Sequence, residues 1–262
     1  IRDPDGDWSS DVCSPISLLW SGASACQAAM TVSGQVLHPG PITLPPEARL
    51  LDAITASQPD AQGYWLAAAW LHRPLIEPQT RLKAGVLFDL DTLRQAALAA
   101  GRDGRADVAA RVYRQVQALP VTGRQRAVLD PVAVEVGFAP NLRVSEGDQL
   151  IYPARPASVR VLGAVAAPCT LAFQAMRAAR DYLDECPAVA GADLDYVWLI
   201  QPDGQVTRLG IAPWNRETAA APAPGSTLLV PLRSDDLEPP TPELNQQLAE
   251  FLATQPLAEV TP

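Results

Sequence analysis

An internal repeat is the feature that most constrains what this chain can fold into. Residues 32–39 and 161–168 both carry Val, Gly, Val and Pro, at offsets 0, 2, 4 and 7. A second phrase closes each copy, because residues 147–155 and 225–233 share Gly, Leu, Pro and Arg at one spacing. Self-similarity of this kind indicates two copies of one structural unit, stacked or linked in a single chain.

Alternating apolar residues and turn signals predict the same elements in each copy, in the order of a β-grasp domain. In the first copy we predict strands at 31–37, 42–44, 66–71 and 149–152 and a helix at 47–56. In the second copy we predict strands at 158–165, 171–173, 196–201, 206–211 and 228–231 and a helix at 175–184. Within this alignment Trp70 matches Trp198.

The first copy is longer than the second, and its extra residues have a helical period. Apolar residues at 82, 86, 90, 93 and 97 predict one helix, which Gly101 ends. A second helix is expected over 106–118, with the turn of a helical hairpin at 103–105. The insert therefore spans about residues 77–126.

The chain after the second copy contains a Pro-rich linker and then a terminal helix. Leu244, Leu248, Phe251 and Leu252 follow the spacing of an amphipathic helix, which either folds back onto the second domain or docks on a partner. We therefore predict an α+β fold of two tandem β-grasp domains, with the helical hairpin inserted in the first. The domains are expected at 29–156 and 157–234, and the linker and helix at 235–262.

Residues 1–28 are interpreted as a leader rather than as part of the fold. Residues 15–28 have the short apolar stretch and small residues of a secretory signal, which predicts an exported protein with no transmembrane segment in its mature chain. Residues 1–14 look foreign to the protein, with a genuine N-terminal tail as the alternative. Cys26 as a lipidation site is the weaker interpretation, because Ala23 stands where a bulky aliphatic residue is usual.

Without the leader two cysteines remain, Cys169 and Cys186, seventeen residues apart. In an exported protein they predict a structural disulfide, with two free buried thiols as the alternative.

Composition excludes several classes of function. A net charge of −9 argues against nucleic-acid binding, which needs an excess of cations. Two histidines in the whole chain leave no His-rich metal site, and no glycine loop for phosphate is present. We expect neither a metal nor a cofactor.

Several phrases together resemble the GfcC-like capsule-biosynthesis family, whose domains are related to the soluble ligand-binding β-grasp domains of polysaccharide-export proteins. They are residues 119–124, 147–165, the span from Cys169 to Cys186, residues 202–215 and the amphipathic C-terminus. The resemblance implies a periplasmic role in capsule or extracellular polysaccharide biosynthesis and export, without known catalytic activity. It also implies an arginine in a pocket near the insert, for which Arg124 is preferred to Arg126.

Each candidate residue has a structural alternative. Arg124 would either grip a carboxylate or phosphate or tie the insert to the sheet through backbone carbonyls. Trp214 and Asn215, or Trp65 and Trp70, would form a sugar-stacking surface or belong to the core.

Signals for an enzyme are weak. The carboxylate pairs Asp89/Asp91 and Asp193/Asp195 stand in turn or cap contexts, whereas a glycosidase needs its pair in one cleft. No Gly-x-Ser-x-Gly occurs, and His38 lies in a predicted hairpin turn. The sequence therefore favours a non-enzymatic protein that binds glycan or the export machinery. The alternatives are an outer-membrane polysaccharide-export lipoprotein subunit and a polysaccharide-processing enzyme.

Overall fold

The computed structural model describes residues 28–217, 221–233 and 241–257. The predicted leader up to residue 27, Cys26 within it, and most of the predicted linker lie outside the described residues.

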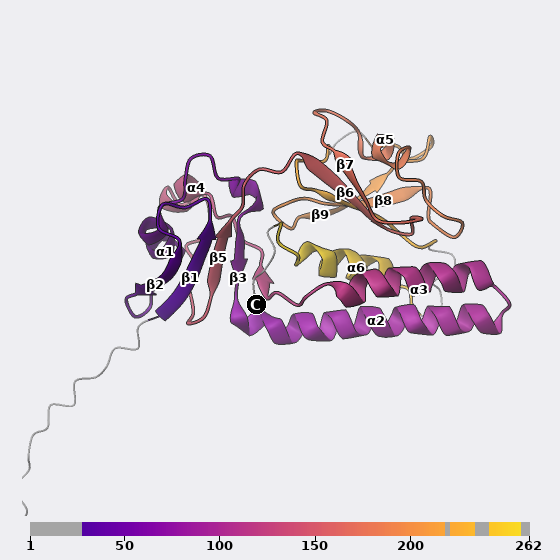
Figure 1. Ribbon diagram of the computed structural model, residues 1–262, viewed down its shortest axis with the longest axis horizontal. Coiled ribbons are helices and arrows are strands. Elements are labelled where there is room, and N and C mark those ends of the chain that lie inside the picture. Colours follow the sequence, from indigo (N-terminus) through magenta and orange to yellow (C-terminus); the bar gives the residue numbers. More distant parts are fainter. Residues whose placement is uncertain (1–27, 218–220, 234–240, 258–262) are drawn as a thin grey trace, which may run out of the picture.

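The first repeat forms a five-stranded sheet in the order β2-β1-β5-β3-β4 (Figure 1). Its central pair, β1 and β5, is parallel, and the other neighbours are antiparallel. The strands are β1 Ala28–Gly34, β2 Gly40–Leu44, β3 Ala69–Leu71, β4 Arg124–Gln125 and β5 Gln149–Tyr152. The helices of this unit are α1 Leu50–Ser57 and α4 Pro131–Glu135, with short 3₁₀ turns at Trp65–Ala67 and Arg73–Leu75.

The second repeat has the same topology, position for position. Its sheet order is β7-β6-β10-β8-β9, and β6 and β10 are its parallel central pair. The elements are β6 Ser158–Gly163, β7 Cys169–Ala172, α5 Ala179–Leu183, β8 Tyr196–Ile200, β9 Val206–Gly210 and β10 Thr227–Val230. The predicted α+β fold of two β-grasp domains is confirmed.

Gly34 and Gly163 show why glycine recurs in the repeat. Both end the first strand of their unit with positive φ, +90° and +96°. A β-carbon would lie 2.1 Å from the Tyr152 carbonyl oxygen at Gly34 and 2.3 Å from the Val230 carbonyl oxygen at Gly163. Only glycine permits this backbone conformation and this close approach to the parallel neighbouring strand.

The alignment of Trp70 with Trp198 is wrong by one residue. Trp70 pairs with Leu150 in the first sheet, whereas Leu199 pairs with the equivalent Leu228 in the second. Because strand side chains alternate between faces, this shift puts the two tryptophans on opposite faces of their sheets. The first sheet also contains a strand that was not predicted, β4, and residues 66–68 are not part of β3.

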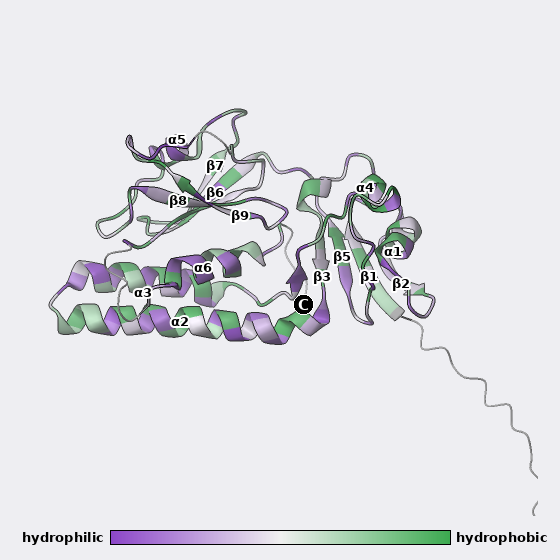
Figure 2. Cartoon of the chain, turned by 180° about the vertical axis from the view of Figure 1, so that it is seen from behind, coloured by the Kyte–Doolittle hydropathy of each residue, from purple (hydrophilic) through white to green (hydrophobic). Residues whose placement is uncertain are grey.

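The insert joins β3 to β4, at the point where the second repeat has the short turn between β8 and β9. It forms the predicted helical hairpin of α2 Ile76–Ala99 and α3 Asp103–Ala118. The turn prediction at 103–105 is wrong: Gly101, with φ +67°, lies between the helices, and Asp103 already begins α3. Both helices alternate hydrophobic and hydrophilic residues along their length (Figure 2).

The insert packs against the second sheet although it belongs to the first repeat in sequence. One core cluster joins α2, α3, the terminal helix α6 Leu244–Ala253 and strands of the second sheet (Figure 1). A separate cluster joins the first sheet to α1 and α4. In α6, Leu244, Leu248 and Phe251 are almost fully buried, so the fold-back alternative is the one observed. No helix in the described part of the chain is long and apolar enough to cross a membrane.

Candidate functional site

Arg124 lies in β4 at the junction of the two repeats, and its residue surface is only 5% exposed. The guanidinium donates hydrogen bonds to three backbone carbonyls. Nη2 reaches the Pro202 oxygen at 2.5 Å, and Nη1 reaches those of Gln255 at 3.2 Å and Ala253 at 3.4 Å. Burial lowers the pKa of Arg124 to about 10, an effect that Asp203 partly opposes. All three partners are backbone carbonyls, and they belong to the β8–β9 turn and to the C-terminal segment.

Neighbouring residues hold Arg124 and the C-terminal segment in place. Gln79 of α2 bridges two consecutive residues: its Nε2 donates to the Arg124 oxygen at 2.9 Å, and its Oε1 accepts from the Gly123 nitrogen at 2.8 Å. The Thr122 hydroxyl donates to the Thr254 oxygen at 2.7 Å. The insert, β4 and the end of α6 therefore form one hydrogen-bonded junction.

Arg126, the second arginine candidate, is exposed. Its side-chain stem lies against Gly204 in the β8–β9 turn, where a β-carbon would be 3.2 Å from the Arg126 Cγ. The residue thus borders the junction of the repeats from outside.

Trp214 projects from the turn after β9 and is 69% exposed. Asn215 fixes this turn: its Oδ1 accepts from the Ala212 nitrogen at 3.0 Å, and its Nδ2 donates to the Asp195 oxygen at 3.0 Å. Asn215 therefore positions its neighbour, whereas Trp214 presents an indole surface to the outside.

Two further residues complete this surface, and the sequence analysis did not identify either of them. The Tyr196 ring meets the Trp214 ring edge to face, with centroids 6.3 Å apart and planes at 88°. The guanidinium carbon of Arg208 lies 3.6 Å from the centre of the Tyr196 ring. We call Trp214, Tyr196 and Arg208 the aromatic platform. The predicted β8–β9 hairpin could have identified Tyr196 and Arg208, because its register places residues 196, 198 and 208 on one face of the sheet.

The other two tryptophan candidates are differently placed. Trp70 is buried, with 2% exposure, and its Nε1 donates to the Asp148 carboxylate at 2.8 Å. Trp65 lines a cavity of about 570 Å³ beside α1 and α4, and its Nε1 donates to the Asp60 oxygen at 3.3 Å. Trp70 is a core residue, and Trp65 is only partly accessible.

Asp148 is a fully buried carboxylate within the first repeat. Besides Trp70, it accepts from the Ser145 nitrogen at 2.9 Å and lies 3.0 Å from the Nδ1 of His72. No hydroxyl or thiol of the described residues is hydrogen-bonded to His72. The pair therefore lacks the nucleophile that a Ser-His-Asp arrangement requires, and it orders the segment between β3 and the insert.

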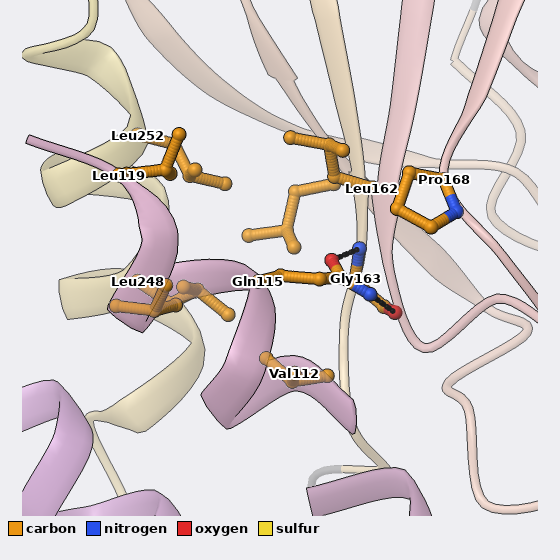
Figure 3. Close-up of a pocket in the computed structure, with 10 residues that line it drawn as sticks. Val112, Gln115, Leu119, Leu162, Gly163, Pro168, Leu248 and Leu252 are labelled. Atoms are coloured by element: carbon orange, nitrogen blue, oxygen red, sulfur yellow. Dashed lines mark hydrogen bonds between the residues drawn. The ribbon is translucent and has the colours of Figure 1, made fainter. Parts of the chain in front are cut away.

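An apolar cavity of about 150 Å³ lies between the insert and the second sheet (Figure 3). Leu119, Leu248 and Leu252 line one side, and Leu162 and Pro168 lie opposite. Gln115 holds α3 to the sheet, since its Oε1 accepts from the Gly163 nitrogen at 3.0 Å and its Nε2 donates to the Gly163 oxygen at 3.3 Å. An apolar space of this size suits a group as small as benzene and offers a sugar too few polar partners.

The carboxylate pair on α2 is not arranged as a catalytic pair. Asp89 and Asp91 lie two apart on α2, a spacing that turns their side chains to different faces. Hydrogen bonds from Arg94 and then Gln95 lower the pKa of Asp91, whereas burial and then Glu243 raise the pKa of Asp89. Within the described residues no three His, Cys, Asp or Glu side chains gather into a metal-binding group.

The predicted disulfide between Cys169 and Cys186 is present. It joins the start of β7 to the segment that follows α5.

Comparisons with known proteins cover both repeats. The family described as "Capsule biosynthesis GfcC, N-terminal" matches residues 27–154, and "Capsule biosynthesis GfcC C-terminal" matches residues 167–256. A relative, "Uncharacterized protein YjbG" from Escherichia coli (strain K12), is 31% identical over 242 residues, which is 90% of this chain and 94% of the relative. The chain belongs to the GfcC capsule-biosynthesis family, which indicates a role in capsule or polysaccharide processes.

Proposed function

We propose that this protein is a non-enzymatic periplasmic component of capsule or extracellular polysaccharide biosynthesis and export, and that it binds the polysaccharide. The observation that carries this proposal is the aromatic platform. Trp214 offers an exposed indole, and Tyr196 supports it edge to face. A sugar ring has an apolar face of C–H groups, which packs on an aromatic ring with little loss of side-chain entropy.

Rigidity of the platform supports the proposal. Asn215 ties the turn that carries Trp214 to Asp195, the residue before β8, and Tyr196 is the first residue of β8 itself. A platform held on a sheet is already organised before the ligand arrives, so binding loses less free energy to ordering.

Other features support the cellular setting and the choice among alternatives. A disulfide persists in an oxidising compartment such as the periplasm, and residues 15–28 have the pattern of a secretory signal. An exporter subunit that assembles through its terminal helix needs the apolar face of that helix exposed, whereas Leu248 and Phe251 are buried within the chain.

The test is binding of purified protein to a panel of neutral and anionic bacterial polysaccharides, followed by tryptophan fluorescence and calorimetry. We expect at least one saturable interaction, which Trp214→Ala weakens by about tenfold or more. Trp65→Ala serves as the matched control and leaves binding unchanged. Absence of binding across the panel, or equal loss in both variants, would refute the proposal. Release of shorter or modified glycan by the purified protein would instead identify an enzyme.

A further inference from the structure

We infer that the aromatic platform selects a carboxylate-bearing sugar, a hexuronate unit of an acidic glycan. This inference rests on the proposed function and goes beyond it, because it names the chemical class of the ligand. It is carried by Arg208, whose guanidinium carbon lies 3.6 Å from the centre of the Tyr196 ring.

Among the residues that the structure describes, none takes up the hydrogen-bond donors of the Arg208 guanidinium, which is stacked on Tyr196. A guanidinium that lies over a ring at this distance contacts the ring through its flat face, whereas its N–H donors point outward in its own plane. Those donors match the two oxygens of a carboxylate, which they bind as a bidentate pair. Within the described residues, the Tyr196 ring is the only partner recorded for the Arg208 side chain.

Position also favours one ligand that reaches both ends of the platform. Tyr196 contacts Trp214 on one side and Arg208 on another, so a single ring separates the indole from the guanidinium. The two groups lie within the reach of a disaccharide. One sugar would stack on Trp214 while the carboxylate of its neighbour, or its own, pairs with Arg208.

Because the chain has a net negative charge, binding of an acidic glycan would require a specific cationic site. With a formal charge of −9, the protein repels polyanions in general, so non-specific attraction does not explain binding of an acidic glycan. Recognition of such a polymer requires a local cation with available donors, and within the described part of the chain Arg208 meets that requirement at the platform.

The experiment compares each acidic glycan with its own neutral derivative. Oligosaccharides of alginate, polygalacturonate and hyaluronan are used intact and after reduction of their carboxylates to alcohols. Wild-type protein is expected to bind at least one intact oligosaccharide about tenfold more tightly than its reduced form, the size expected for a charge-assisted hydrogen-bonded pair. Arg208→Gln removes that preference, Arg208→Lys restores only part of it, and Arg126→Gln leaves it intact.

The possible outcomes separate the inference from the proposed function. Equal binding of intact and reduced forms, both weakened by Trp214→Ala, would overturn the hexuronate inference and leave polysaccharide binding in place. An unchanged preference in Arg208→Gln, with its fold verified by circular dichroism, would also overturn the inference. Failure of the protein to bind any polysaccharide would remove the proposed function and the inference together.

Discussion

The guanidinium of Arg124 in the first sheet donates a hydrogen bond to the carbonyl of Pro202, in the turn between two strands of the second sheet. The same guanidinium reaches the carbonyls of Ala253 and Gln255 at the end of α6. Segments far apart in the sequence therefore meet at one buried cation. Since each bond has a charged donor, the junction is stronger than one built from neutral groups.

Replacing Arg124 is expected to destabilise the protein. Arg124→Met keeps an apolar stem but leaves three buried carbonyls without this donor, and we expect a loss of about 2–4 kcal/mol in the free energy of unfolding. Urea denaturation measures the loss. Arg126→Met, at the exposed neighbouring arginine, is expected to stay within about 0.5 kcal/mol of wild type. Equal effects of both substitutions would show that the contacts of Arg124 contribute little.

Asp148 gives a second test, within the first repeat. Asp148→Ala removes the acceptor for the buried Trp70 indole and for the partly buried Ser145 nitrogen. We expect a loss of about 2–3 kcal/mol or more, read as a lower urea midpoint. Asp184→Ala, at an exposed carboxylate, is the control. A midpoint for Asp148→Ala close to that of the control would contradict this account.

The disulfide between Cys169 and Cys186 is expected to contribute about 3 kcal/mol, because it closes a short loop and restricts the unfolded chain. The double substitution Cys169→Ser/Cys186→Ser should lower the melting temperature. Treatment of the wild type with a reducing agent should lower it similarly, while the double variant should not respond to reduction. A variant as stable as the oxidised wild type would rule out a stabilising role for this bond.

Tyr152 predicts a loss of stability at alkaline pH. Burial, and then the carboxylate of Asp130, raise the pKa of the Tyr152 phenol above its ordinary value of 10.0. In the unfolded chain this phenol loses its proton near pH 10, whereas the folded protein retains it. The unfolded state therefore binds fewer protons, and the free energy of unfolding falls as pH rises through 10, by up to about 1.4 kcal/mol per pH unit.

Urea midpoints measured from pH 8 to about pH 11 test this slope. Tyr152→Phe is expected to reduce the alkaline slope. Tyr64, whose pKa burial also raises, still contributes in that variant. The hypothesis fails if the profile of Tyr152→Phe parallels that of the wild type.

The sequence predicts secondary structure where a periodic pattern lies within one segment, and it predicts less well how distant segments pack together. Alternation along strands and the repeated phrases identified both β-grasp units, and the apolar stripes of α2, α3 and α6 showed that these helices bury one face. The stripes do not specify which sheet the helices cover, because the hydrophobic effect is non-directional and burial against either sheet removes the same apolar area from water. β4 was missed because a two-residue strand has no periodicity to detect.

The sequence predicted the residue types of the candidate site but not their exposure or their contacts, which depend on the tertiary structure. Trp214 was identified as a residue type suited to sugars, but its exposure depends on the turn that Asn215 holds. Arg124 was identified as an anion-binding or structural residue, but its three carbonyl partners lie in segments that are far apart in the sequence and could not be predicted from it. Arg208 was within reach of sequence reasoning, because the hairpin register places it on the face of Tyr196 and Trp198.

The position of the insert has a thermodynamic consequence. A small β-grasp unit buries little surface and is only marginally stable alone. Here α2 and α3, which belong to the first repeat in sequence, contribute to the core of the second. A second repeat produced without the first would keep α6 but lose α2 and α3 from its core. The stability of the second repeat therefore depends on helices that belong to the first repeat in sequence, although the two repeats look independent along the chain.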